Sequence, residues 1–375
     1  MVNKIKLGDV ATYINGYAFK PEDRGEEGLP IIRIQDLTGN AYDLGFYKGK
    51  YPEKIEINDG DVLISWSASL GVYVWSRGKA LLNQHIFKVA FDKVDINKNY
   101  FVYAVKYKLI EMASKTHGAT MKHIVKKDFD ATEIPYPEME QQIKIATTLD
   151  KVSYIIEAKK QELQELDNLI KSRFVEMFGD MTLNPNGWEV VSLGQVCDVR
   201  DGTHDSPKYH TEGYPLVTSK NVTSGKIDFT DCSLICEEDY NKIKERSKVD
   251  FGDILMPMIG TVGKPVIVDV EAEFAIKNVA LVKFYEDSKV INIFVKELLQ
   301  SDYFDRAVIS EIRGGTQKFI ALGDIRKLQI CLPPIEVQND FANFVNQVDK
   351  LKFEVQKSLN ETQTLMDSLM QQYFG

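Results

Sequence analysis

The sequence lacks the features of a membrane or secreted protein. No run approaches the roughly eighteen consecutive apolar residues that a membrane-spanning helix needs. The opening segment, MVNKIKLGDVATYING, has no apolar core of the kind found in a signal peptide. We therefore expect a cytoplasmic protein with no membrane partner.

Cysteine is scarce as well, with only Cys197, Cys232, Cys236 and Cys331. All four lie in the second half and none has CxxC spacing, which favours buried thiols over the alternative of zinc ligands. The 375 residues are 44% hydrophobic and 27% charged, which is ordinary for globular protein. This length is sufficient for two domains, each with its own core.

Motifs for catalysis are also missing. The chain has no Asn-Pro-Pro or Asp-Pro-Pro followed by an aromatic residue, as an amino-methyltransferase needs, and no strand followed by a glycine-rich cofactor loop. GTVGKP (260–265) is too short for a phosphate-binding loop and has proline where a magnesium-binding Ser or Thr belongs. DGTHDSPKYH (201–210) could hold a metal, but a polar turn-rich loop explains it better. We expect no catalytic residue, metal or cofactor in this chain.

The net charge of −9 would argue against a nucleic-acid partner if it were spread evenly. Residues 1–137 carry 19 Lys and Arg against 17 Asp and Glu, whereas residues 181–335 carry 18 against 23. The remaining helical stretches carry 9 against 15. A basic face on either domain is therefore compatible with the overall acidity.

A long heptad pattern covers residues 141–178 and occurs again over residues 337–374, at a constant offset of 196 residues. Apolar residues alternate in steps of four and three, which is typical of a helix that packs against another helix. In the first copy these seam residues are Ile145, Leu149, Val152, Ile156, Leu163, Leu166, Ile170 and Met177. In the second copy they are Phe341, Val345, Val348, Val355, Leu359, Met366, Leu369 and Tyr373.

Two arrangements of these helices are open: each helix could lie on its own domain, or the two could pair. About five heptads without Gly or Pro, present twice, favour pairing. The link after Gly179 is short, and a helix of about 38 residues spans roughly 57 Å. The second helix is therefore expected to run back antiparallel to the first. We predict a dumbbell with an internal pseudo-twofold axis and neighbouring chain termini.

The globular parts repeat too. KIKLGDVATYING corresponds to WEVVSLGQVCDVRDG, GDVLISWSASLG to GDILMPMIGTVG, and HGATMKHI to RGGTQKFI. Many short β-like segments with few helices indicate a largely antiparallel α+β domain. We predict domain 1 over residues 1–137, spacer helix 1 over 138–180, domain 2 over 181–333 and spacer helix 2 over 334–375.

Polar loops in both domains carry side chains that can contact base edges or phosphates. A solvated surface loop is the alternative for each, and core packing is the alternative for the tryptophan. In domain 1 the candidate DNA contacts are Ser65, Trp66, Gln84, His85, Thr116, His117, Thr120, Lys122 and His123. In domain 2 they are Thr203, His204, Ser219, Lys220, Lys277, Asn278, Arg313, Thr316, Gln317 and Lys318.

These phrases, together with the junctions IPYPEMEQQIKIATTLD and CLPPIEVQNDFANFV, resemble the specificity subunits of type I restriction–modification enzymes over essentially the whole chain. The resemblance implies a prokaryotic protein whose two target recognition domains each bind one part of a split DNA site. It also implies a scaffold for two modification (methyltransferase) subunits and the restriction (translocase) subunits. S-adenosylmethionine, ATP and magnesium would then belong to those partners.

The sequence thus predicts a non-catalytic subunit that binds double-stranded DNA at a bipartite site. Two other classes of function are weighed against it. A coiled-coil scaffold that binds only proteins predicts no salt-dependent affinity for duplex DNA. A self-contained methyltransferase or nuclease predicts that the purified chain alone modifies or cuts DNA.

Overall fold

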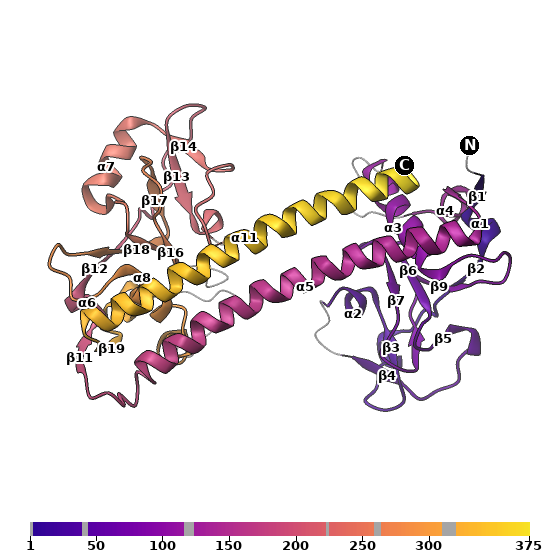
Figure 1. The fold of residues 1–375 in the computed structure, drawn as a ribbon, viewed down its shortest axis with the longest axis horizontal. Coiled ribbons are helices and arrows are strands. Elements are labelled where there is room, and N and C mark those ends of the chain that lie inside the picture. Colours follow the sequence, from indigo (N-terminus) through magenta and orange to yellow (C-terminus); the bar gives the residue numbers. More distant parts are fainter. Residues whose placement is uncertain (1–2, 40–43, 116–123, 223–224, 259–263, 310–319) are drawn as a thin grey trace. The chain divides into compact units, whose positions relative to one another are not determined.

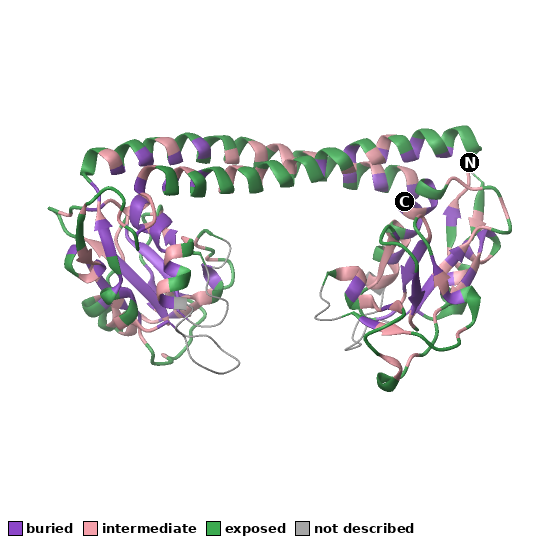
Figure 2. Cartoon of the chain, turned by 90° about the horizontal axis from the view of Figure 1, so that it is seen from below, coloured by how far each residue is buried: buried purple, intermediate pink, exposed green. Residues whose placement is uncertain are grey.

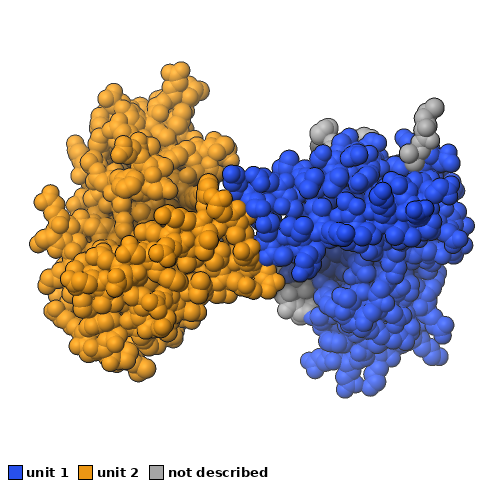
Figure 3. Space-filling view, in the orientation of Figure 1, with its two compact units in different colours: residues 1–160, 357–375 blue, residues 161–356 orange. Residues whose placement is uncertain are grey.

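The computed structural model describes residues 3–39, 44–115, 124–222, 225–258, 264–309 and 320–375. The chain divides into two compact units, residues 1–160 with 357–375 and residues 161–356 (Figure 3). Each unit contains one globular domain and a part of both long helices. Within the described ranges, no helix is long and apolar enough to cross a membrane.

Unit 1 contains two four-stranded sheets and a two-stranded ribbon (Figure 1). The first sheet is antiparallel throughout, in the order β2 (Thr12–Asn15), β9 (Ile86–Ala90), β6 (Val62–Ser65), β7 (Gly71–Val74). The second has the order β4 (Gly45–Tyr47), β3 (Leu29–Ile32), β8 (Ala80–Leu82), β5 (Glu56–Ile57), and β3 pairs with β8 in parallel. The ribbon joins β1 (Lys4–Lys6) to β10 (Glu133–Pro135).

Unit 2 repeats this plan. Its antiparallel sheet has the order β12 (Cys197–Asp201), β18 (Val279–Phe284), β15 (Ile254–Pro257), β16 (Val266–Ile267). A second sheet has the order β14 (Ser233–Ile235), β13 (Tyr214–Thr218), β17 (Ala275–Lys277), with β13 and β17 parallel. The ribbon joins β11 (Glu189–Ser192) to β19 (Gln329–Leu332). Equivalent strands follow one another in the same order along the chain, so the predicted internal repeat is confirmed.

The helices of the domains are short, apart from one in each unit. Unit 1 has α1 (Leu7–Val10), α2 (Ile34–Thr38), α3 (Lys98–Lys115) and α4 (Lys126–Ala131), with 3-10 turns η1 (Pro21–Asp23) and η2 (Glu53–Ile55). Unit 2 has α6 (Leu193–Val196), η3 (Ser219–Asn221), α7 (Glu237–Ser247), α8 (Asn292–Leu298), α9 (Asp302–Phe304), the π-helical turn η4 (Asp305–Ile309) and α10 (Leu322–Lys327).

Two segments of the chain are interrupted in the structure. The helical stretch that follows β18 is divided into α8, α9 and η4, because the Ser301 hydroxyl caps a new helical start by accepting a hydrogen bond from the Phe304 N–H at 3.3 Å. The β-like runs LLNQHIFKVAF and FAIKNVALVKF are each divided as well, into β8 and β9 and into β17 and β18.

The two long helices are α5 (Met139–Phe178) and α11 (Ile335–Phe374), each 40 residues long. Helix α5 starts in unit 1 and ends in unit 2, whereas α11 starts in unit 2 and ends in unit 1, so the pair is antiparallel in both. In unit 1, Ile145, Leu149, Val152 and Ile156 of α5 share one buried cluster with Met366 of α11. Leu359, Leu369 and Tyr373 pack against that cluster while half-buried.

In unit 2 the same packing joins the end of α5 to the start of α11. Ile170 lies in one buried cluster with Phe341, Val345 and Val348, and Leu166 and Met177 pack against it. Leu163 and Val355, near the division between the units, are half-buried. Figure 2 shows that the buried residues of each long helix lie toward its two ends, next to the domains. The predicted α+β fold with an antiparallel two-helix coiled coil is therefore confirmed.

A buried glutamine ties each long helix to its own domain. Gln142 is 1% exposed and Gln338 is 0% exposed, and the repeat offset of 196 residues relates them. The Gln142 side chain accepts from the Asn97 N–H at 2.9 Å and donates to the Pro137 carbonyl at 2.8 Å. Buried amide groups are costly unless they are paired, so these contacts fix the direction in which each helix leaves its domain.

Candidate nucleic-acid interface

Both domains contain a turn with left-handed backbone between equivalent strands, just before β9 in unit 1 and just before β18 in unit 2. The turn of unit 1 is the longer, with residues 83–85 between its strands, whereas unit 2 has Asn278 alone. His85 and Asn278 occupy these positions with φ values of +71° and +55°. Left-handed backbone is uncommon for residues other than glycine, and such strain gathers at functional sites. The repetition of this conformation makes the two turns, hereafter the junction turns, candidates for function.

A close backbone approach supports each junction turn. A Cβ atom on Gly16 would lie 2.0 Å from the Asn83 carbonyl oxygen, and one on Gly202 would lie 2.2 Å from that of Ile276. Only glycine lets the segment after β2 or β12 come so near. That segment then forms a parallel bridge to the turn, Tyr17 with Asn83 and Thr203 with Lys277.

In unit 2 the structure gathers predicted residues that are far apart in the sequence. The His204 ring forms hydrogen bonds through Nδ1 with Asn278 Oδ1 and through Nε2 with Asp201 Oδ2, both at 2.8 Å. The Ser219 hydroxyl donates to the Asn278 carbonyl at 3.2 Å, and Lys277 Nζ donates to the Ser206 hydroxyl at 2.6 Å. This junction turn thus carries a connected polar network.

Electrostatics favour a charged imidazole in this network. The hydrogen bond with Asn278 and then the one with Asp201 raise the pKa of His204, while burial and the nearby Arg246 act in the opposite direction. The His204 side chain is 55% exposed, so it lies at the surface. The site therefore presents a positive or readily protonated group to solvent.

The remaining predicted residues of unit 2 lie around this network. Thr203 is half-buried, and its backbone N–H donates to the Ile276 carbonyl at 2.9 Å. Lys220 is exposed, and its Nζ donates to the Asp231 carbonyl at 3.2 Å. Thr203 follows β12 and Lys220 lies in η3, and both of these segments contact the junction turn.

Unit 1 builds its junction turn from different side chains. The Trp66 indole stacks on Phe87 at 5.5 Å and meets His85 edge to face at 5.0 Å. Gln84 is exposed, whereas Ser65 is fully buried and its hydroxyl donates to the Ser69 carbonyl. Trp66 and Ser65 thus support the turn, and His85 and Gln84 lie nearer the surface. Among the described residues, the buried Nδ1 of His85 has no hydrogen-bond partner.

The Gly-Thr loop residues predicted from the sequence lie outside the described residues. They are Thr116, His117, Thr120, Lys122, His123, Arg313, Thr316, Gln317 and Lys318. The residues that follow these loops are anchored alike, because the Ile124 N–H donates to the Trp66 carbonyl at 3.0 Å and the Ile320 N–H donates to the Met258 carbonyl at 3.1 Å. Both acceptors come just after equivalent strands, β6 and β15.

Sequence reasoning considered Asp201 only as part of a possible metal-binding loop, 201–210, and did not indicate Arg246. Asp201 is 6% exposed, and its second carboxylate oxygen forms an ion pair with Arg246 of α7. The Arg246 carbonyl in turn accepts from Arg200 Nη1 at 3.0 Å. A signal for Asp201 was available, because it occupies the end of β12 just before the close-approach glycine. Arg246 comes from a helix with no counterpart in the described part of domain 1, so the internal repeat does not indicate it.

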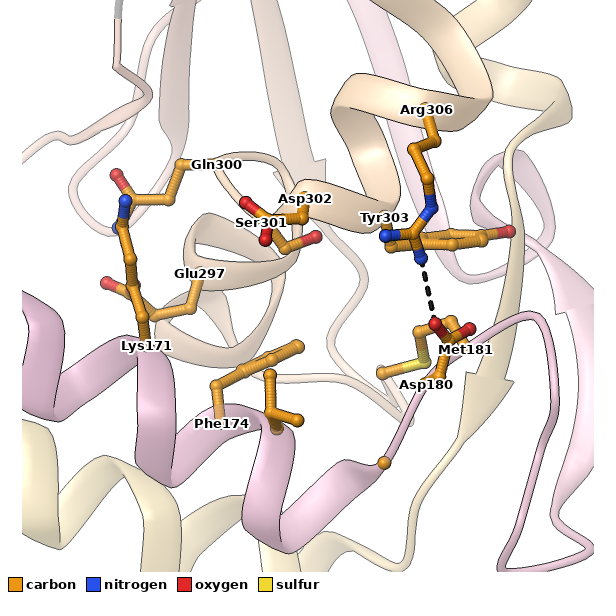
Figure 4. A pocket seen from close by; sticks show the side chains of 12 residues that line it. Lys171, Phe174, Asp180, Met181, Glu297, Gln300, Ser301, Asp302, Tyr303 and Arg306 are labelled. Carbon is orange, nitrogen blue, oxygen red and sulfur yellow. Dashed lines mark hydrogen bonds and ion pairs between the residues drawn. The ribbon is translucent and has the colours of Figure 1, made fainter.

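A cavity of about 240 Å³ lies elsewhere in unit 2, between the end of α5 and the segment α8–η4 (Figure 4). Phe174 and Met181 line it, and Arg306 forms an ion pair with Asp180 at 2.8 Å along one side. None of the predicted DNA contacts among the described residues lines this cavity.

The cysteines form no cluster around the polar network. Cys197 and Cys331 are buried, and Cys232 and Cys236 are half-buried with free thiols. Burial raises the pKa of Cys197 to about 12, which keeps this thiol protonated at neutral pH.

Comparison with known proteins identifies the class. Residues 2–168 and 185–363 both match the family model for the type I restriction modification DNA specificity domain. The chain belongs to this family and contains its domain twice. It is a DNA specificity subunit of a type I restriction–modification system.

Individual relatives agree over nearly the full length. The specificity subunit of the type I restriction enzyme EcoBI from Escherichia coli is 24% identical over 399 residues, which cover 98% of this chain and 83% of that protein. The MjaVIII specificity subunit from Methanocaldococcus jannaschii is 25% identical over 367 residues, covering 92% and 86%.

Solved structures share the fold. The S subunit of a type I restriction–modification system from M. genitalium superposes with a TM-score of 0.54 at 15% identity, covering 100% of this chain and 96% of that one. A chain from a study of complex assembly and conformational transition of the type I system gives a TM-score of 0.57 at 16% identity, covering 99% and 97%.

Proposed function

We propose that the two domains recognise different halves of one bipartite site in double-stranded DNA. The observation that carries this proposal is the junction turn, which joins equivalent strands and has a left-handed residue in both domains but carries different side chains. Domain 1 presents Gln84 and His85, whereas domain 2 presents His204, Lys277 and Asn278. A shared scaffold with different polar groups is what two readers of unlike sequences need.

The side chains suit these roles chemically. Gln84 can pair bidentately with adenine, and Lys277 can donate to guanine or to phosphate. Left-handed backbone at His85 and Asn278 places these side chains where an ordinary strand would not.

The long helices have two roles in this proposal: they set the spacing of the half-sites and they bind two modification subunits. Exposed apolar residues support the second role, because repeat-related positions carry them in both helices. Ile155 and Leu351 form one such pair, 42% and 56% exposed, and Leu169 and Leu365 form the other, 46% and 50% exposed. Each unit thereby presents one residue from each helix, as two equivalent partners would require.

We assign the chemistry to partner subunits. Methyl transfer with S-adenosylmethionine would belong to the modification subunits, and ATP- and magnesium-dependent cleavage to the restriction subunits. This chain would then act without catalytic groups or cofactors of its own. If the purified chain modified or cut DNA by itself, this assignment would be wrong.

Binding to duplex DNA at graded salt concentration tests the proposal against a purely protein-binding scaffold. With the modification subunits present, log K should fall linearly with log salt, losing roughly a thousandfold or more between 50 and 200 mM if six or more phosphates are contacted. A duplex of scrambled sequence is the control and should bind more weakly at each salt concentration. Absence of measurable duplex binding would favour the scaffold.

A further inference from the structure

Helix α7 supplies a second cationic group to the junction turn of domain 2. Arg246 lies in its last turn, and the side chain is 65% exposed. Its Nη2 contacts Asp201 Oδ1, while His204 Nε2 contacts Oδ2 of the same carboxylate at 2.8 Å. One buried carboxylate thus holds two surface groups side by side.

The placement of Asp201 is informative because a buried carboxylate is unfavourable unless it is paired. The Asp201 side chain is only 9% exposed, and it contacts the two side chains through separate oxygens. The position of Arg246 is further restricted at the backbone, since Arg200 Nη1 donates to its carbonyl at 3.0 Å. Arg200 is itself held by Asp198 on β12, so α7 is fastened to the strand that ends at Asp201.

The guanidinium of Arg246 has more donors than Asp201 can use. Arginine presents five N–H groups in a planar fork, and Asp201 offers it one oxygen. The exposed remainder suits the O6 and N7 acceptors of guanine, the commonest specific contact of arginine in the major groove. An arginine held by a buried acid also loses less side-chain entropy on binding than a free one.

We propose that Arg246 is a specificity-determining residue of domain 2 that contacts a guanine edge, and that Asp201 is the positioning residue that aims it. This inference rests on the proposed function and names one contact of that site. His204 completes the arrangement by linking Asp201 to Asn278 on the junction turn. Helix α7 thereby adds a base contact to domain 2.

The test uses the chain assembled with its modification subunits. The complex methylates a library of plasmids in which the recognised positions are randomised, and sequencing of modified sites gives the preference at each base pair. Arg246→Ala is expected to abolish the preference for guanine at one position of the half-site bound by domain 2, by about tenfold or more, and to leave the other half-site unchanged. Lys242→Ala, an exposed charge on the same helix, is the matched control.

Asp201→Asn tests the positioning role. This substitution preserves the size of the side chain but removes the charge that pairs with Arg246. The preference for guanine at the same position should therefore weaken. A purely structural role would instead lower methylation of every sequence in equal proportion. If the Arg246→Ala chain does not assemble with the modification subunits, Arg246→Lys is the alternative variant. It keeps the charge without the planar guanidinium and should weaken the preference for guanine at the same single position.

The outcomes distinguish a failure of the proposed function from a failure of the inference about Arg246. A wild-type complex that methylates no bipartite motif would contradict the proposed function. A wild-type complex with a bipartite motif would leave that function intact, and this inference would then fail if Arg246→Ala kept the motif unchanged. It would fail equally if Arg246→Ala weakened all positions uniformly, which indicates a phosphate contact.

Discussion

Replacement of Gln338 by alanine should weaken the packing of the start of α11 against domain 2. The Gln338 side chain accepts from the Ile291 N–H at 3.0 Å and donates to the carbonyls of Lys289 and Pro333, both at 2.9 Å. Gln338 is 0% exposed, so its loss leaves three backbone groups without their partner. At about 1 kcal/mol for each hydrogen bond, we expect a loss of about 3 kcal/mol.

Native-state hydrogen exchange of the full chain measures this loss locally. A destabilisation of about 3 kcal/mol should lower the protection of amides in the first turns of α11, such as that of Val345, by about two orders of magnitude if opening of this region limits exchange. Gln338→Glu separates hydrogen bonding from packing, because glutamate has the same shape but cannot donate to the two carbonyls. We expect it to destabilise at least as much as alanine does.

Gln372→Ala, on the exposed side of the same helix, is the control and should change stability by less than about 0.5 kcal/mol. The reasoning would be refuted if Gln338→Ala behaved like this control. It would also be refuted if Gln338→Glu were as stable as the wild type, because the hydrogen bonds would then contribute nothing measurable.

Three further predictions concern spacing, pH and salt. Deleting residues 158–164 and 355–361 together shortens both helices by about 10 Å and should shorten the gap between half-sites by roughly three base pairs, as seen in the methylated motif; an unchanged gap would contradict the ruler role. The hydrogen bond to Asn278 raises the pKa of His204, so the stabilisation due to His204 should be complete below pH ~6.5 and be lost as pH rises through the higher folded-state value. The difference in unfolding free energy between wild type and His204→Gln measures this, and a difference that grows with pH would contradict it. Lys277→Ala should reduce the magnitude of the salt slope of DNA binding by about one if Lys277 contacts a phosphate, and an unchanged slope would exclude that contact.

The fold was largely predictable because its main determinants are repeated. The heptad spacing predicts the paired helices, and the structure buries Ile145, Leu149, Phe341 and Val345 on the predicted side. The heptad pattern does not indicate Phe178, which lies outside the predicted seam and packs in the core of domain 2. A seam of period 3.5 describes contact with another helix, whereas contact with a sheet follows no such period.

The candidate site was predictable only in part. The sequence indicates His204, Lys277 and Asn278 as polar candidates for DNA contact, and the structure brings all three to one junction turn. The partnership of Asp201 with Arg246 could not be foreseen, because it joins residues from a strand end and a distant helix. Residue type and spacing do not encode such a pairing, which depends on how α7 packs.

The exposed fraction distinguishes candidate DNA contacts that the sequence pattern does not distinguish. Ser65 and Gln84 are both polar candidates for DNA contact, yet Ser65 is 0% exposed and Gln84 lies at the surface. The signal for the buried glutamines was present, since Gln142 and Gln338 recur at the repeat offset, each three residues before an apolar seam residue that is followed by alanine. Repetition of a polar residue within an apolar seam is the feature that would have identified them.

Sequencing the methylated motifs in a cell that carries this chain with its modification subunits tests the central claim most directly. The account predicts a split, asymmetric motif, with two unlike specified halves separated by a fixed number of unspecified base pairs. Exchanging domain 2 alone should change one half and preserve the other half and the gap. A continuous motif, or a motif that does not depend on this chain, would contradict the account.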